Sequence, residues 1–131
     1  MTDTEYTTWL ELYKGSRRQA LQEEWINRLQ LDHWTIRIHD QLRPEEMSVA
    51  DTDGCVNYET STKTARVEIL DPKYYGDRVR GYDYERTLVH ELLHIKLAMI
   101  DDSGNDVQDR VLHQLVDELA GALVEARRAE V

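Results

Sequence analysis

The stretch that decides the fold reads Leu88-Val89-His90-Glu91-Leu92-Leu93-His94, the pattern H-E-x-x-H among apolar residues. Residues four apart share one face of an α-helix, so the imidazoles of His90 and His94 can meet on one metal ion. The carboxylate of Glu91 can then reach a metal-bound water, an arrangement typical of zinc hydrolases. The competing interpretation is a pair of structural histidines in a helical core that binds no metal.

The apolar residues around this motif recur with the period of a largely buried helix. Two apolar sides are predicted, and they consist of Leu88, Leu92, Ile95 and Met99, and of Val89, Leu93 and Leu97. Only a narrow sector around Glu85 and Lys96 is polar, Asp83 suits the N-cap, and the polar residues 101–105 end the helix. Buried polar side chains need partners, and one metal ion satisfies both histidines and the glutamate.

A catalytic zinc takes three protein ligands and keeps one position open, so the chain must supply a third. The candidates lie downstream, mostly on a helix predicted over 106–129: Asp101, Asp102, Asp106, Asp109, His113, Asp117 and Glu118. The helical wheel favours His113, which flanks an apolar stripe predicted to be core: Leu112, Leu115, Val116, Leu119 and Leu123. Glu118 shares its side with Gly121 and is expected to face solvent. Asp109, Asp117 and Glu118 stay open as alternatives.

The rest of the chain predicts a single α+β domain over residues 1–131. Helical periodicity covers 1–15 and 16–31, with Ser16 as an N-cap, and period-two alternation predicts strands over 34–40 and 64–70. Residues 41–62 form a predicted loop with a short strand near 56–58. Cys55 is the single cysteine and is expected in a turn, so no internal disulfide can form.

Composition and charge narrow the partners. A formal net charge of -10 argues against nucleic acid, because phosphate binding relies on concentrated lysine and arginine. Four basic residues, Lys73, Arg78, Arg80 and Arg86, are interrupted by acidic ones, which favours a solvated surface. No apolar run approaches the roughly 20 residues of a membrane span, and the N-terminus lacks the regions of a signal peptide. We therefore expect a cytoplasmic protein with no membrane partner.

On these residues the chain resembles small single-domain zincin metallopeptidases of the gluzincin type, the minigluzincins, and also SprT-like proteins. The resemblance covers Trp34 to Leu123 and implies a zincin-like fold: N-terminal helices, a small, mostly antiparallel sheet, and the H-E-x-x-H helix packed on a C-terminal ligand helix. In gluzincins a glutamate on that last helix is the third ligand, and an aspartate four residues later supports a zinc histidine. The matching positions here are His113 and Asp117. Histidine at the first of them resembles the all-histidine ligand set of SprT-like proteins.

The resemblance implies a zinc-dependent endopeptidase. One Zn2+ ion would be held by His90, His94 and His113, with Glu91 as general base and Asp117 orienting a ligand histidine. A tyrosine is expected to stabilise the oxyanion; Tyr82 and Tyr84 are the candidates, with Tyr74 and Tyr75 as alternatives. The substrate would be a peptide or protein added as a strand along Ala65 to Ile69. The alternative function is a metal-stabilised regulatory or binding protein, of the kind a phage would use, without significant turnover.

Overall fold

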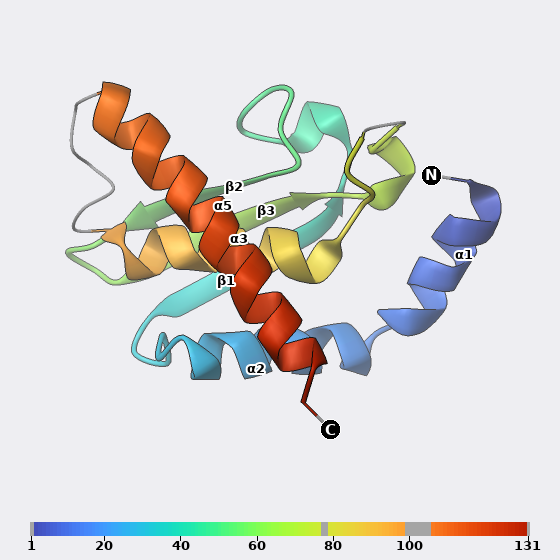
Figure 1. Ribbon diagram of the computed structural model, residues 1–131, viewed down its shortest axis with the longest axis horizontal. Helices are drawn as coiled ribbons and strands as arrows, with labels where there is room; N and C mark the ends of the chain where they lie inside the picture. The colour runs from blue at the N-terminus through green and yellow to red at the C-terminus, as the bar shows by residue number, and fades with distance from the viewer. Residues whose placement is uncertain (1, 77–78, 99–105, 131) are drawn as a thin grey trace.

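Four α-helices and a mixed three-stranded sheet make up the part of the chain that the computed structural model describes, residues 2–76, 79–98 and 106–130, the last with side chains from 109 onward. The elements follow the chain as α1 (Asp3–Leu12), α2 (Ser16–Arg28), β1 (Thr35–Leu42), the 3-10 turn η1 (Pro44–Glu46), β2 (Gly54–Glu59), β3 (Thr64–Leu70), η2 (Pro72–Tyr74), α3 (Tyr84–Lys96) and α5 (Asp106–Arg128) (Figure 1). The predicted α+β class is confirmed. Ser16 was predicted to be the N-cap of α2, but it is the first helical residue, and the N-cap is Gly15.

The sheet has the order β1-β3-β2, with β1 parallel and β2 antiparallel to β3. The prediction of a mostly antiparallel sheet is therefore wrong, because alternation reports which face of a strand is buried but not its direction. The buried face carries Ala65, Val67 and Ile69, with Ile38 and Val56 opposite Val67 on the two neighbours. β3 is central, so both of its edges are already paired.

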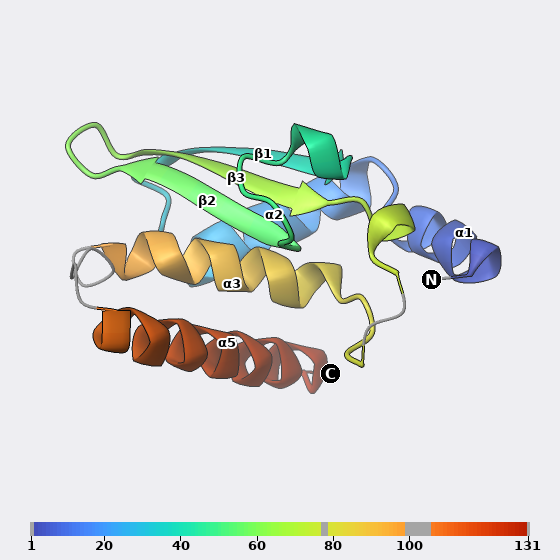
Figure 2. The same cartoon turned by 90° about the horizontal axis from the view of Figure 1, so that it is seen from above.

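Helix α3 lies between the sheet and α5, as Figure 2 shows. Both neighbours cover it, and nine of its residues are buried, which agrees with the predicted apolar sides. Asp83 caps the helix as predicted, accepting a hydrogen bond from the backbone N–H of Arg86 at 3.1 Å. The predicted end of this helix, including Met99 and the turn at 101–105, falls outside the described residues.

Glu85 corrects the predicted polar sector of α3, because its side chain is buried. Its carboxylate accepts hydrogen bonds from the Trp25 indole at 2.7 Å and from the Arg128 guanidinium at 3.1 Å. Arg128 also pairs with Asp83 at 2.8 Å. These bonds attach the C-terminal turn of α5 to the first turn of α3 and to α2.

Helix α5 forms the outer layer and crosses α3 (Figure 1). Among its described residues, the buried core side chains are Val116, Ala120 and Val124. Leu115 and Leu119 were predicted to be core, but they are 48% and 40% exposed. The wheel identified an apolar stripe wider than the single face that α3 covers.

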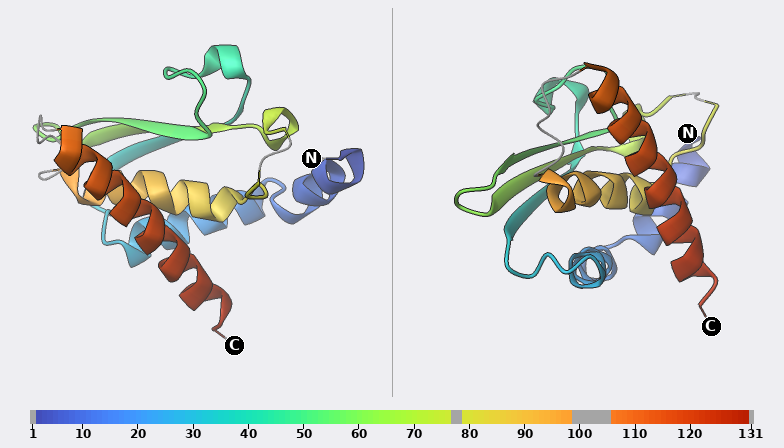
Figure 3. Two further views of the ribbon diagram at one scale, coloured as in Figure 1. Left: turned by 45° about the horizontal axis from the view of Figure 1, so that its top comes forward. Right: turned by 60° about the vertical axis from the view of Figure 1, so that its left-hand side comes forward.

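Helix α1 lies at the end of the molecule away from the β2–β3 turn (Figure 3). Trp9 is its buried residue, and its ring packs edge-on against Tyr82 and Tyr84 at centroid distances of 6.1 and 6.0 Å. Aromatic packing of this kind joins the N-terminal helix to the segment that leads into α3. Within the described residues, no helix has both the length and the apolar character needed to cross a membrane.

Candidate metal centre

Three imidazoles meet between α3 and α5. The ring centroids of His90 and His94 are 5.0 Å apart, and that of His113 lies 4.8 Å from the first and 5.3 Å from the second. One ring nitrogen of each residue can be chosen so that all three lie within 4.8 Å of one another. Helical spacing places the first two on one face of α3, and α5 brings the third to them. The cluster can hold a metal ion.

The position of His113 decides among the candidates for a third ligand. Of the described side chains, those of Asp109 and Glu118 are exposed and lie outside the histidine cluster. Asp117 belongs to the site in another way, through a contact between its Oδ1 and His90 Nδ1 at 3.3 Å. Asp101 and Asp102 fall outside the described residues, as does the side chain of Asp106. The structure thus brings together the three predicted histidines and places Asp117 behind one of them.

His90 is suited to metal binding by its surroundings. Burial lowers the pKa of its imidazole to about 4, and the neighbouring His94 and His113 act in the same direction, against the contact with Asp117. The ring is therefore neutral at pH 7, the form in which a histidine binds a metal. A neutral ring carries one N–H, and donation of that N–H from Nδ1 to Asp117 leaves the Nε2 lone pair for a ligand.

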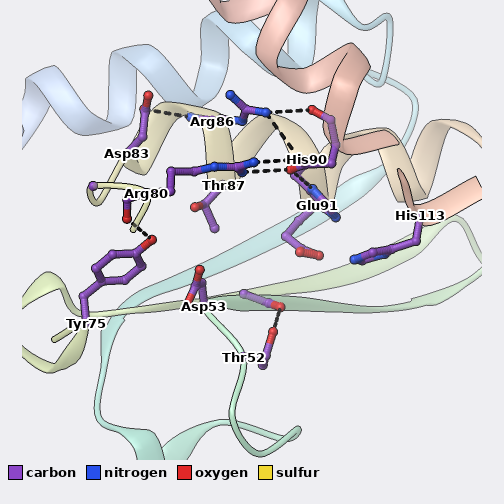
Figure 4. Close-up of a pocket in the computed structure, with 13 residues that line it drawn as sticks. Thr52, Asp53, Tyr75, Arg80, Asp83, Arg86, Thr87, His90, Glu91 and His113 are labelled. Atoms are coloured by element: carbon purple, nitrogen blue, oxygen red, sulfur yellow. Dashed lines mark hydrogen bonds and ion pairs between the residues drawn. The ribbon is translucent and has the colours of Figure 1, made fainter. Parts of the chain in front are cut away.

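Glu91 lies beside the cluster, with a side chain only 5% exposed. Figure 4 shows its carboxylate and the His113 ring reaching into the same space. The first residue of β2, Gly54, passes close to it: a Cβ there would lie 3.3 Å from Glu91 Cγ and 2.9 Å from Thr87 Cγ2. Because Gly54 has no side chain, β2 can lie close to α3 at Glu91, the candidate general base.

A pocket of about 210 Å³ opens next to these residues. One wall is the segment Thr52–Gly54, and the opposite walls are α3 and α5. The loop that precedes α3 closes one end of it through Tyr75, Arg80 and Gly81. His113 is exposed, so the histidine cluster can be reached from solvent through this pocket.

Of the four tyrosines considered for the oxyanion, Tyr82 and Tyr84 lie away from the pocket. Tyr82 donates its hydroxyl to the Leu70 carbonyl at 3.1 Å, and Tyr84 donates to Asp40 at 2.6 Å. Both point into the packing under α1, so neither lines the pocket. Tyr75, one of the alternatives, does line it, but its hydroxyl donates to the Arg80 carbonyl at 2.8 Å. A loop without a period gives no sequence signal for which of its aromatic residues faces a site.

Two arginines predicted to lie on a solvated surface belong to the site instead. The Arg80 guanidinium contacts both carboxylate oxygens of Asp117, at 3.2 and 3.1 Å, and Arg86 contacts Oδ2 at 3.3 Å. Figure 4 shows both side chains pointing toward α5. The hydrogen bond from Arg80 is the largest influence that lowers the pKa of Asp117 to about 2. The only sequence signal was the position of Arg86, one helical turn before His90.

The other residues considered for metal chemistry lie elsewhere. Cys55 is in strand β2 rather than in a turn, and its thiol donates to Glu68 at 3.2 Å. Burial raises the pKa of this thiol to about 11, with Glu68 adding to the effect, so it is neither a thiolate ligand nor a nucleophile at pH 7. His39 contacts Arg66 at 3.3 Å on the far side of the sheet, and like His33 it lies outside the cluster.

The donor set fits a divalent transition metal, because imidazole is a ligand that zinc, copper and nickel share. A carboxylate behind one ligand and a second carboxylate beside the cluster complete the arrangement. Comparisons of the chain with protein-family models, with curated proteins and with solved structures gave no match.

Proposed function

We propose that the chain is a zinc-dependent peptidase, of the zincin type that its motif resembles. The observation that carries the proposal is the meeting of His90, His94 and His113, from two different helices, beside the buried carboxylate of Glu91. Two histidines alone would follow from the spacing of the motif. A third from α5, twenty-three residues after His90, is not required by that spacing.

Zinc is the metal proposed because three histidines with one open position are a common catalytic zinc set. Tetrahedral bonds of about 2.1 Å place ligand nitrogens about 3.4 Å apart. The three nitrogens here lie within 4.8 Å of one another, which supports a site for one ion. When bound, zinc would supply Lewis acidity that activates the attacking water and polarises the scissile carbonyl.

Glu91 would act as the general base. Its carboxylate lies one residue after His90 and points into the space next to His113 (Figure 4), so it can take a proton from the attacking water. It would then pass this proton to the leaving amine. We assign the oxyanion role to none of the tyrosines, since Tyr82 and Tyr84 lie away from the pocket and the Tyr75 hydroxyl is already engaged.

The substrate is proposed to be a peptide or protein in extended form. Strand β3, including Ala65 to Ile69, cannot accept another strand because β1 and β2 occupy both of its edges. The outer edge of β2 pairs with no strand among the described residues, and the start of β2 lines the pocket. An added strand along β2 would therefore pass the histidine cluster.

The test combines metal analysis with one conservative variant. Protein purified without chelator is expected to contain one zinc per chain, and Glu91→Gln is expected to keep the metal while cleavage of casein or a peptide library falls by about a hundredfold or more. Glu118→Gln, an exposed change on α5, is the matched control and should cleave normally.

The outcomes separate the hypotheses. Absence of stoichiometric metal in the wild type, together with unchanged thermal stability of His90→Ala under added zinc, would refute both metal-based functions. Metal without cleavage by any variant would favour the alternative, a metal-stabilised regulatory or binding protein.

A further inference from the structure

Gly121 lies in the interior of α5, where glycine is about 1 kcal/mol less favourable than alanine. It was expected on a solvated side, but it is buried. The guanidinium of Arg86 covers it: a Cβ on Gly121 would lie 2.9 Å from Cζ, Nη1 and Nη2 of that arginine. α5 therefore has no side chain at the position where the guanidinium lies against the helix backbone.

Arg86 makes its hydrogen bonds from this position to Asp117, one helical turn earlier on α5. Its Nη2 donates to the Asp117 carbonyl oxygen and to Oδ2, both at 3.3 Å. Its Nε is buried and, within the described residues, has no hydrogen-bond partner. An unpaired buried donor is unfavourable. The guanidinium is thus held at Asp117 and Gly121 although this position leaves one of its own groups unsatisfied.

Arg80 approaches the same carboxylate from the loop before α3. Its two terminal nitrogens donate to Oδ1 and Oδ2 of Asp117 in a bidentate pair, a geometry that fixes orientation as well as distance. The Tyr75 hydroxyl, bonded to the Arg80 carbonyl, holds the backbone of this loop. The Asp117 carboxylate therefore accepts hydrogen bonds from two guanidinium groups, and its Oδ1 also contacts His90 Nδ1.

We propose that Arg86, seated on Gly121, and Arg80 are positioning residues that hold Asp117 in the rotamer that orients His90 for metal binding. The inference rests on the proposed function in one respect, namely that the histidine cluster binds a metal. Asp117 is 30% exposed and would sample several rotamers if unrestrained. Held in place, it fixes the tautomer and the plane of the His90 ring before a metal arrives.

The competing explanation is that the arginines only tie the loop, α3 and α5 together. A second one is simple charge repulsion, in which a nearby guanidinium weakens the binding of any cation. The three explanations predict different results for metal affinity and for stability of the metal-free protein.

The cleanest variant is Gly121→Ala, because alanine favours the helix and its methyl group displaces only the flexible end of Arg86. The dissociation constants for Zn2+ and Co2+, measured by competition with a chromophoric chelator, are expected to rise about tenfold. The d–d bands of bound Co2+ should change as well, since they report ligand geometry. Thermal stability of the metal-free variant should not fall, whereas a purely structural role predicts a loss of stability with unchanged affinity.

Two substitutions of Arg86 test the charge explanation. Both Arg86→Lys, which keeps the charge, and Arg86→Gln, which removes it, are expected to weaken metal binding about tenfold, because neither side chain places a planar guanidinium whose Nη2 donates to both the carbonyl oxygen and Oδ2 of Asp117. Charge repulsion predicts tighter binding by Arg86→Gln and no change in Arg86→Lys. The matched control is Arg127→Gln on α5, of similar exposure and paired with Glu24 instead, which should bind metal normally.

A double-mutant cycle with Asp117→Asn tests whether Arg86 affects metal binding through Asp117. If Arg86 acts through Asp117, adding Arg86→Gln to Asp117→Asn should leave the metal dissociation constant within about twofold of the single Asp117→Asn value. Equal effects of Arg86→Gln in both backgrounds would overturn the proposal, as would wild-type affinity in Gly121→Ala and Arg86→Lys. Wild type that binds no metal would refute the proposed function along with this inference; wild type that binds metal but cleaves nothing would refute the peptidase alone.

Discussion

Glu68 is held as a charged carboxylate inside the protein, with a residue exposure of 1%. It accepts hydrogen bonds from the Ser48 backbone at 2.7 Å, the Ser48 hydroxyl at 2.8 Å and the Arg66 guanidinium at 2.8 Å. Burial alone would raise its pKa, but these donors outweigh burial and lower it to about 2. The carboxylate thereby bonds the loop after β1 to strand β3. This loop continues to Thr52, which lines the pocket.

Because of Glu68, the unfolding free energy should decrease as the pH falls below about 4.5. Its pKa is about 2 in the folded protein against 4.5 unfolded, so its contribution of about 3 kcal/mol is complete above pH 4.5 and is lost as the pH falls toward 2. The difference in unfolding free energy between wild type and Glu68→Gln, measured by denaturant in metal-free protein, should shrink by about half between pH 7 and pH 3. A difference that stays constant over this range would contradict the assignment.

His113 is exposed, whereas the other two histidines are buried or nearly so. A metal bond to an exposed ring can be lost without disturbing the core. The residue therefore allows a substitution in which metal binding and folding are measured separately.

His113→Ala should weaken zinc retention strongly, by at least a hundredfold, while the metal-free protein keeps its unfolding free energy within about 0.5 kcal/mol. Dialysis against a graded series of chelator concentrations, followed by metal analysis, measures the retention. Glu118→Ala, on the neighbouring solvated side of α5, is the comparison and should retain zinc normally. The reverse ranking would identify Glu118 as the ligand.

Among the elements, the contact between β2 and α3 is the one that shapes the site. Gly54 has a backbone neighbour in the Glu68 carbonyl, 3.2 Å from where a Cβ would lie, in addition to Thr87 and Glu91. The strand is thus clamped between β3 and the helix. No larger residue fits without moving one of them.

Gly54→Ala is expected to destabilise the protein by about 1–3 kcal/mol, as overpacking does, and to lower the proposed peptidase activity by displacing Glu91. Thermal unfolding and a cleavage assay measure the two effects. Gly81→Ala is the control for stability alone, because nothing lies within 4 Å of a Cβ at that position. Equal stability of the two variants would mean that β2 can move off α3 freely.

Elements whose sequence signal comes from neighbouring residues were predicted correctly, whereas features that depend on distant segments were not. The alternation of Ala65, Val67 and Ile69 and the wheel around His90 depend on neighbours in sequence, and β3 and α3 were predicted correctly. β1 beside β3 is a pairing between distant segments, and nothing in the alternation of β1 gave its direction. Leu115 and Leu119 were assigned to the core because a wheel shows an apolar stripe but not how much of it a neighbour covers.

The site divides in the same way. His90, Glu91 and His94 follow from helical spacing alone, and His113 followed from its position beside an apolar stripe. Arg80 and Gly121 could not be predicted, because each acquires its role from a residue more than thirty positions away, Asp117 for the first and Arg86 for the second. The pattern of charges along the sequence cannot distinguish a solvated arginine from one that forms an ion pair with a carboxylate distant in sequence.

At the scale of the whole molecule, the histidine cluster joins two layers. A metal that binds the folded protein but not the unfolded chain stabilises the folded state by RT ln(1 + [L]/Kd), where [L] is the free metal concentration. This amounts to about 4 kcal/mol when [L] is a thousand times Kd. The site spans α3 and α5, so this free energy resists separation of the two helices.

Added zinc should therefore raise the midpoint of thermal unfolding by about 10 °C or more in wild type, and a chelator should reverse the shift. His94→Ala should show no such shift. His39→Ala, a histidine on the far side of the sheet, should show the full shift, which controls for nonspecific binding of zinc to imidazoles. A shift of equal size in His94→Ala would place the metal elsewhere.

The strand order β1-β3-β2 also has a consequence for how the chain folds. β2 and β3 are separated by only the four residues 60–63, so their hairpin closes at little entropic cost, whereas β1 can join β3 only after the 21 residues 43–63 have been looped back. We expect the hairpin and the α3–α5 pair to form early and β1 to dock late. Pulse-labelled hydrogen exchange should then protect the β2–β3 amides before those of β1. The half of the chain that carries the histidines would thus be assembled before the sheet is complete.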